Sequence, residues 1–373
     1  LKGPRLAHSS PFFVGLRSLR GAGASVQRAR QGGSQARVRT SAMGVLGGCC
    51  KFSVAIGIVP LSVIVAVFLE TPTVLELDAA SLEASSSSST EAAAVGEQSS
   101  GSTSGEFGKA DAEGFGGGGM FDRIAFVYDS TNKWMSLGLD QFWRKTLVQE
   151  CLKLEKGDRV LDLATGTADV SLLVGGRLRD LGADTSAGPV VMGLDPSGEM
   201  LRRGVAKVEG KGLDGMVRLV KGDAQDLTSV RGIDAAGVLT EPMDGVAAGS
   251  IDKISMSFGI RNVPDRAKAF REMKRVLRKQ DTSRVCILEF SLPDGEKFLS
   301  KVAKTFITKV VPFIGKIATM NSGSKEYEYL ERSILKFPKP RDFAAQMTRE
   351  GLRATSITSF AFGAVHLYAA SPV

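Results

Sequence analysis

Short apolar runs alternate with amphipathic segments over the C-terminal two thirds of the chain. Five runs are apolar and short enough to predict strands, at 159–163, 190–194, 217–220, 251–257 and 285–290. Between the last two, the segment 266–278 places Ala269, Met273, Val276 and Leu277 on one helical face and bases on the other. This alternation predicts an α/β fold with a doubly wound, mostly parallel sheet, in which ligands bind beyond the carboxyl ends of the strands.

The first 119 residues show no such alternation. Residues 1–42 are rich in Arg, Ser, Gly and Ala and contain no acid, a composition typical of transit peptides. Residues 52–69 form an apolar run, which we interpret as a cleaved targeting element, with a permanent membrane anchor as the alternative. We therefore predict a targeting region over 1–79, a disordered Ser/Gly/Glu linker over 80–119 and the folded domain over 120–373.

Charge and rare residues narrow the function classes. The chain has 48 Lys+Arg and 40 Asp+Glu, and no basic run is interleaved with aromatic residues, so nucleic-acid binding is not expected. A solvated surface, or a basic face for an anionic membrane, accounts for the excess. Two His and four Cys without ligand spacing argue against a metal site. We expect a reduced protein in which Cys151 and Cys286 are buried thiols.

Candidate ligand-binding residues follow the first two predicted strands. Asp162 lies in the first strand, and a turn containing Thr165, Gly166 and Thr167 comes directly after it. The turn matches neither the dinucleotide fingerprint nor a Walker loop, which disfavours a nicotinamide dehydrogenase and a phosphate cradle. Asp195 ends the second strand, where a carboxylate accepts the two hydroxyls of a ribose or caps the next helix.

The next two strands continue the pattern. The third runs into Asp223 and Ala224, where a polar side chain suits an adenine amine, unless this is an ordinary surface turn. The fourth ends at Ser257. The three acids and the serine at these strand ends can hydrogen-bond the hydroxyls and the exocyclic amine of a nucleoside. The lack of a phosphate-binding loop indicates that this nucleoside carries no phosphate. S-adenosylmethionine meets that description.

Two stretches of the domain carry a specific resemblance. FDRIAFVYD (121–129) and SFGIRNV (257–263), the latter followed by REMKRVL (271–277), are similar to the ubiquinone/menaquinone biosynthesis C-methyltransferases of the UbiE type. VLDLATGTAD (160–169) resembles the cofactor loop of that family, and the resemblance covers nearly all of 120–373. It implies a seven-stranded, Rossmann-like class I methyltransferase sheet whose last strand is antiparallel. The S-adenosylmethionine contacts that it implies are Thr167, Asp195, Asp223, Ala224 and Ser257.

The resemblance also implies the chemistry, which is C-methylation of the ring of a prenylated quinol. Arg261 is our candidate for stabilising the phenolate, directly or through a water that acts as base, and Asn262 for orienting that group. The alternative for Arg261 is a salt bridge to Asp265 at a helix start. Tyr128 and Asp129 are expected to close over the cofactor.

Three departures from the family pattern stand out. Ala168 occupies a position where the family usually has Gly, residues 228–248 form a longer connection, and residues 279–281 replace a Pro-Gly-Gly sequence. His366 lies in a terminal apolar run, where we expect a strand histidine facing partners or solvent.

The substrate and the compartment stay open between alternatives. A naphthoquinol on the way to phylloquinone or menaquinone is our first expectation, and the benzoquinol of ubiquinone synthesis the second. Rival functions are methylation of RNA or another small molecule, and a non-catalytic scaffold in a quinone-synthesis complex. The possible protein partners are such a complex or further copies of the chain in a homo-oligomer. The basic amphipathic stretch 297–320 suits a membrane surface or a core-facing helix. Residues 283–290 and 325–330 favour a plastid, with the matrix side of the mitochondrial inner membrane as the alternative.

Overall fold

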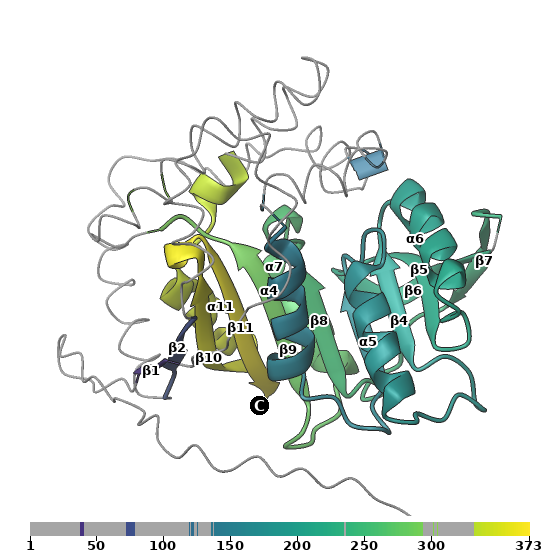
Figure 1. Ribbon diagram of the computed structural model, residues 1–373, viewed down its shortest axis with the longest axis horizontal. Helices are drawn as coiled ribbons and strands as arrows, with labels where there is room; N and C mark the ends of the chain where they lie inside the picture. Colours follow the sequence, from purple (N-terminus) through teal and green to yellow (C-terminus); the bar gives the residue numbers. More distant parts are fainter. Residues whose placement is uncertain are drawn as a thin grey trace, which may run out of the picture.

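Among the residues that the computed structural model describes, eleven strands form one sheet (Figure 1). The structure describes residues 38–40, 72–78, 119, 121–122, 125, 136, 138–234, 236–293, 301, 304 and 332–373. In sheet order the strands are β1 (Val38–Thr40), β2 (Thr73–Glu76), β10 (Leu352–Phe360), β11 (Val365–Pro372), β9 (Arg284–Phe290), β8 (Lys253–Ser257), β3 (Val160–Leu163), β4 (Val191–Asp195), β5 (Val217–Asp223), β6 (Asp226–Ile233) and β7 (Leu239–Asp244).

The seven central strands, from β10 to β5, confirm the predicted fold class. The neighbouring pairs among β9, β8, β3, β4 and β5 are all parallel, whereas β11 is antiparallel to both β9 and β10. Each of the five strands predicted from apolar runs is present with small shifts at its ends. Because β3, β4, β5 and β8 run in the same direction, their carboxyl ends meet along one edge of the sheet.

Helices cover both faces of this sheet. The helical segments described over their whole length are α4 (Asp140–Thr146), the π-helix η2 (Leu147–Cys151), α5 (Asp169–Asp180), α6 (Gly198–Gly210), the short η3 (Ile260–Asn262), α7 (Arg266–Val276), α11 (Pro340–Arg349) and η5 (Ala361–Gly363). Apolar side chains of α7 and α11 pack with one face of the sheet, and those of α4, η2, α5 and α6 with the other. In Figure 1, α4 and α5 lie across the face that is nearer the viewer.

Four further strands extend the sheet at its two edges. The long connection 228–248 contributes most of the antiparallel pair β6 and β7 beyond β5. At the other edge β2 pairs with β10, and β1 pairs with β2. The folded domain is predicted to begin near Met120, and both of these strands lie before it. An extended segment of only four residues carries too weak a pattern to be recognised within a stretch of targeting composition.

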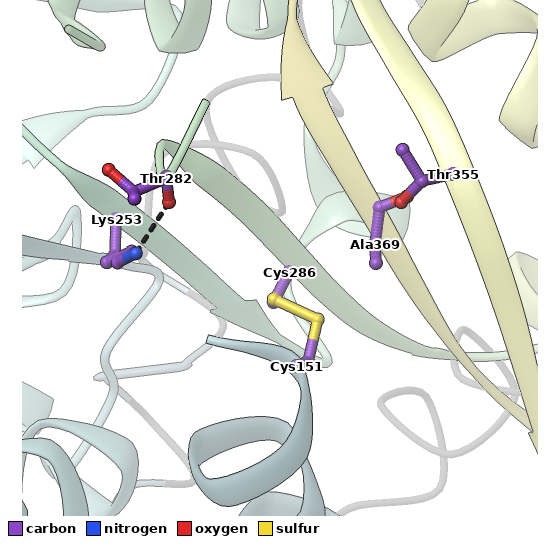
Figure 2. The surroundings of a disulfide bond; sticks show 6 residues. All are labelled: Cys151, Lys253, Thr282, Cys286, Thr355 and Ala369. Atoms are coloured by element: carbon purple, nitrogen blue, oxygen red, sulfur yellow. Dashed lines mark hydrogen bonds between the residues drawn. A yellow bond between two sulfur atoms is a disulfide. The ribbon is translucent and has the colours of Figure 1, made fainter. Parts of the chain in front are cut away.

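A disulfide joins Cys151 to Cys286, so the expected pair of buried thiols is wrong (Figure 2). Their Cα atoms lie 6.1 Å apart although 135 positions separate them in sequence. The bond connects the last residue of η2 to the middle of β9. Figure 2 shows Thr355 and Ala369 on one side of the bond, and Lys253, which donates to the carbonyl of Thr282, on the other. Spacing rules missed the pair because only the fold brings the helix end over the strand.

His366 is also buried, contrary to the expectation that it faces partners or solvent. It lies in β11 between Glu289 of β9 and Ser359 of β10, because β11 is an inner strand of the sheet. Within the described ranges, no helix is long and apolar enough to cross a membrane, and no group of acidic, His and Cys residues is arranged to hold a metal. The stretch 297–320 lies outside the described residues except for Lys301 and Lys304, and the run 52–69 lies wholly outside them.

Breaking the disulfide is expected to lower the free energy of unfolding by about 2–5 kcal/mol, since a loop closed over this many residues restricts the unfolded chain strongly. Thermal unfolding with and without dithiothreitol measures the loss. The Cys151→Ser/Cys286→Ser variant is the matched control, and its unfolding should not respond to the reductant. Alkylation of Cys151 and Cys286 in the denatured, unreduced protein would show that the bond is not formed.

Candidate active site

A cavity of about 660 Å³, open solvent at its mouth included, lies at the carboxyl ends of β3, β4, β5 and β8. Six of the predicted site residues line it: Gly166, Asp195, Asp223, Ala224, Ser257 and Asn262. They come from four different strand ends and the turns after them, as expected for a doubly wound sheet.

Asp195 is the central acid of the cavity. Its Oδ2 accepts the backbone N–H of Gly166 at 2.8 Å, and its Oδ1 accepts that of Ser197 at 2.9 Å. Ser197, and not Asp195, caps α6, because its hydroxyl accepts the N–H of Met200. Burial raises the pKa of the Asp195 carboxyl to about 6, with smaller contributions from Asp162 and Asp122 in the same direction, although its two backbone hydrogen bonds oppose the rise.

Asp162 lies beneath the cofactor loop and outside the cavity lining. Its carboxylate accepts hydrogen bonds from the hydroxyls of Thr165, Ser171 and Ser255 at 2.7 to 2.8 Å. Burial raises the pKa of this carboxyl, and the three hydroxyls counteract the rise. The structure therefore places Asp162 and Thr165, both predicted to bind the cofactor, where they hold the loop in shape.

Thr167 also lies outside the cavity lining. Its hydroxyl accepts a hydrogen bond from Lys207 of α6 at 2.7 Å, and the same ammonium group reaches Asp169 at 2.9 Å. The backbone of the loop is unusual at Ala168, which has φ of +69° and precedes α5. Glycine adopts this left-handed conformation at little cost, whereas alanine does so with strain. This conformation is a physical reason why glycine is usual at this position.

The cofactor loop and the SFGIRNV stretch (257–263) touch directly. A side-chain carbon added to Gly259 would lie 2.4 Å from Cβ of Ala164, so this position has no room for one. Ala164 and Phe258 have φ of +51° and +58°, values that residues other than glycine rarely adopt. Such strain persists where the surroundings impose it, and it often marks functional sites.

Arg261 does not line the cavity, and its partner is not Asp265. Its Nη1 donates to Oε1 of the fully buried Glu289 at 2.5 Å, and its backbone N–H donates to Oε2 at 3.2 Å. A third bond runs from Nη1 to the carbonyl of Phe258 at 3.1 Å. Asp265 instead caps α7 by accepting the N–H of Lys268. Arg261 is thus held on the end of β9, next to the cavity wall.

The opening segment of the domain is described only in part. Tyr128 and Asp129, predicted to close over the cofactor, lie outside the described residues. Phe121 lines the cavity, and Asp122 accepts hydrogen bonds from the hydroxyl of Ser197 and the N–H of Glu199. The first residues of the domain therefore reach the cavity and the start of α6.

Comparison with known proteins identifies the family. Residues 113–371 match the model of the ubiE/COQ5 methyltransferase family. The chain belongs to this family. It is an S-adenosylmethionine-dependent methyltransferase.

The alignments with two curated relatives cover nearly the full length of each relative. A ubiquinone/menaquinone biosynthesis C-methyltransferase UbiE of Geotalea daltonii is 33% identical over 249 residues, which are 67% of this chain and 93% of the relative. A demethylmenaquinone methyltransferase of Thermus thermophilus is 33% identical over 250 residues, 66% of this chain and 98% of the relative. A solved SAM-dependent methyltransferase from Aquifex aeolicus has a TM-score of 0.41 at 16% identity, covering 63% of this chain and 92% of that one.

The cavity of the methyltransferase fits S-adenosylmethionine by the chemistry of its groups. Asp195 presents carboxylate oxygens for ribose hydroxyls, and Asp223 lies where an amine is expected, both in the cavity lining. Among the described residues, the buried Oγ of Ser257 has no hydrogen-bond partner. An unpaired buried hydroxyl is unfavourable unless a ligand completes it, which supports a polar ligand at this position.

Several lining residues are not among those predicted from the sequence. The largest group is apolar and flanks the polar positions: Ala164, Leu194, Met200, Met256 and Phe258. Gln225 was also missed, although its side chain donates to both oxygens of Asp223 and accepts the N–H of Asp265. Leu194, Met256, Phe258 and Gln225 are close sequence neighbours of predicted residues, so extending each strand end by one or two positions would have found most of them.

Cofactor affinity is expected to fall as the pH drops through about 6, because a protonated Asp195 loses an acceptor for the ribose hydroxyls. Above that value the carboxylate is ionised and the affinity is at its plateau. Calorimetric titration should give a Kd about tenfold weaker at pH 5 than at pH 7.5, since a tenth of a group with a pKa of 6 is ionised at pH 5. The control Asp195→Asn should bind weakly at both pH values. An equally steep pH dependence in that variant would assign the effect to another group.

Proposed function

We propose that the enzyme methylates a ring carbon of a prenylated quinol, of the demethylphylloquinol or demethylmenaquinol type. The observation that carries the proposal is the SFGIRNV stretch, which forms a wall of the cofactor cavity and holds Arg261 beside it. The names of relatives at 32 to 33% identity, which include demethylmenaquinone methyltransferases, support the same reaction class.

A ring carbon becomes a nucleophile when a neighbouring hydroxyl loses its proton, because the phenolate places charge on the ortho carbon. When bound, S-adenosylmethionine supplies the methyl group that this carbon accepts. The protein must then stabilise the phenolate, exclude water and hold the reacting groups in line. Asn262 lines the cavity, and the ring of Phe258 stacks on that of Phe290 with 4.6 Å between the ring centroids. Polar and aromatic groups therefore both border the place where a quinol ring would lie.

Arg261 is the proposed phenolate stabiliser. Its Nε is buried and has no hydrogen-bond partner among the described residues, so one donor is left for a phenolate oxygen or for a water. Glu289 takes up the other side of the guanidinium and fixes its orientation. A buried carboxylate also moderates the positive charge, which lets the pair be buried without a bare cation. The guanidinium is then oriented before the substrate arrives, as electrostatic catalysis requires.

The proposed compartment is the plastid, on the grounds of the basic, acid-free leader composition and the apolar run that follows it. A prenyl tail makes the substrate a membrane lipid, so we also propose that the enzyme works at a membrane surface. The rival scaffold function would not require a cavity with an ionisable Asp195 and an unpaired Ser257 hydroxyl.

Methylation assays with the full chain test the substrate. With S-adenosylmethionine present, a reduced prenylated demethyl-naphthoquinol should gain one methyl group by mass spectrometry, and the matching demethyl-benzoquinol should react at least tenfold more slowly. Faster reaction of the benzoquinol would assign the enzyme to ubiquinone synthesis. Cofactor binding without turnover of either quinol would overturn the proposal, and Asp195→Ala serves as the control that binds no cofactor.

Removing the negative charge of Glu289 is expected to impair catalysis without impairing cofactor binding. Glu289→Gln should lower kcat by 10- to 100-fold, because hydrogen bonds to charged groups contribute about 1.5–3 kcal/mol, whereas the Kd of S-adenosylmethionine should change less than threefold. Arg261→Met should lower kcat in the same way, and the double variant should lose little more than either single variant. Additive losses in the double variant would mean that the two residues act independently.

A further inference from the structure

The edge of β10 holds a strand that comes from before the linker. Residues 73–76 pair with residues 356–359 in antiparallel register, with Val74 opposite Thr358 and Leu75 opposite Ile357. The N–H of Leu77 donates to the carbonyl of Thr355 at 2.9 Å, which extends the ladder by one residue.

Apolar contacts fix the face that this strand presents. Leu75 and Leu77 are partly buried against the core that α7, α11 and the sheet share, whereas Thr73 and Glu76 are exposed. Leu75 and Leu77 are two positions apart and therefore share one face of the strand, which is the face that lies on the core. A strand without a buried face could pair with its neighbour in more than one register.

An uncovered β10 would be a liability for the protein. It is nine residues long, and Leu352, Ala354, Ile357 and Phe360 are buried along it. A long apolar edge exposes unpaired backbone groups to other chains, and proteins usually cover such an edge. Residues 73–77 cover positions 355–359 of this edge from within the same chain, so they serve the folded domain and not the leader.

We propose that residues 72–78 are a permanent strand of the mature enzyme, docked on β10 after the leader has been removed. Any processing cleavage then falls before Pro72, and the linker 80–119 stays in the working protein as the connection between this strand and the rest of the domain. The targeting region predicted over 1–79 contains, on this proposal, a structural strand at its C-terminal end.

Hydrogen exchange on the full chain measures the docking. Amides of residues 73–77 should exchange at least tenfold more slowly than those of the linker. Leu75→Asp/Leu77→Asp should abolish this protection and speed exchange at 356–359, whereas the matched control Thr73→Asp, at an exposed position of the same strand, should leave it in place. Exchange at 73–77 as fast as in the linker would overturn the proposal.

Two further readouts address register and maturation. The pair Val74→Cys/Thr358→Cys should cross-link on oxidation, as mapped by mass spectrometry, and the displaced pair Val74→Cys/Ser356→Cys should not. The N-terminal peptide of the enzyme recovered from its cells should begin at or before Pro72. A mature chain that begins after Leu77, or equal cross-linking of both pairs, would contradict the proposal. None of these measurements depends on which quinol is methylated.

Discussion

Three hydroxyl groups converge on the carboxylate of Asp162, which is sealed beneath the cofactor loop. They come from the loop, from α5 and from β8, so this one carboxylate connects three elements. An acid buried without a cation must have its oxygens hydrogen-bonded, or its burial is strongly unfavourable. Gly193 makes the arrangement possible, since a side chain there would collide with the hydroxyls of Thr165 and Ser171. The position of Gly166 against Asp195 follows from this anchored turn.

The catalytic side depends on a second buried acid of a different kind. Glu289 forms an ion pair with Arg261, and Arg266 at the start of α7 also interacts electrostatically with the Glu289 carboxylate. Asp162 is thus satisfied by neutral donors and keeps the loop rigid, whereas Glu289 is satisfied by a charged side chain that it orients. The two acids divide the edge of the sheet into a cofactor half and a half proposed for the quinol.

Local sequence was enough to predict a site residue where its position depends only on one strand and the turn that follows it. The strand ends that carry Asp195, Asp223 and Ser257 could be predicted because each lies at the end of a short apolar run. The partner of Arg261 could not, because Glu289 is 28 positions away and acids near Arg261 in sequence compete as candidates. The disulfide and the burial of His366 could not be predicted either. The disulfide depends on the packing of η2 over β9, and the burial of His366 depends on the order of the strands in the sheet. Edge strand β2 escaped because four residues give too little periodicity.

The register of the sheet sets a line of residues across four strands. Thr73 of β2 lies opposite Ser359, which lies opposite His366, which lies opposite Glu289. With neighbouring strands about 4.8 Å apart, Thr73 is about 15 Å from the acid that orients Arg261. The polypeptide before Thr73 therefore joins the sheet at the rim where cofactor and quinol would meet, while Asp78 lies toward the opposite rim. A membrane-binding segment or a fluorescent label attached directly before Pro72 would therefore start at the rim of the sheet that holds the cofactor cavity.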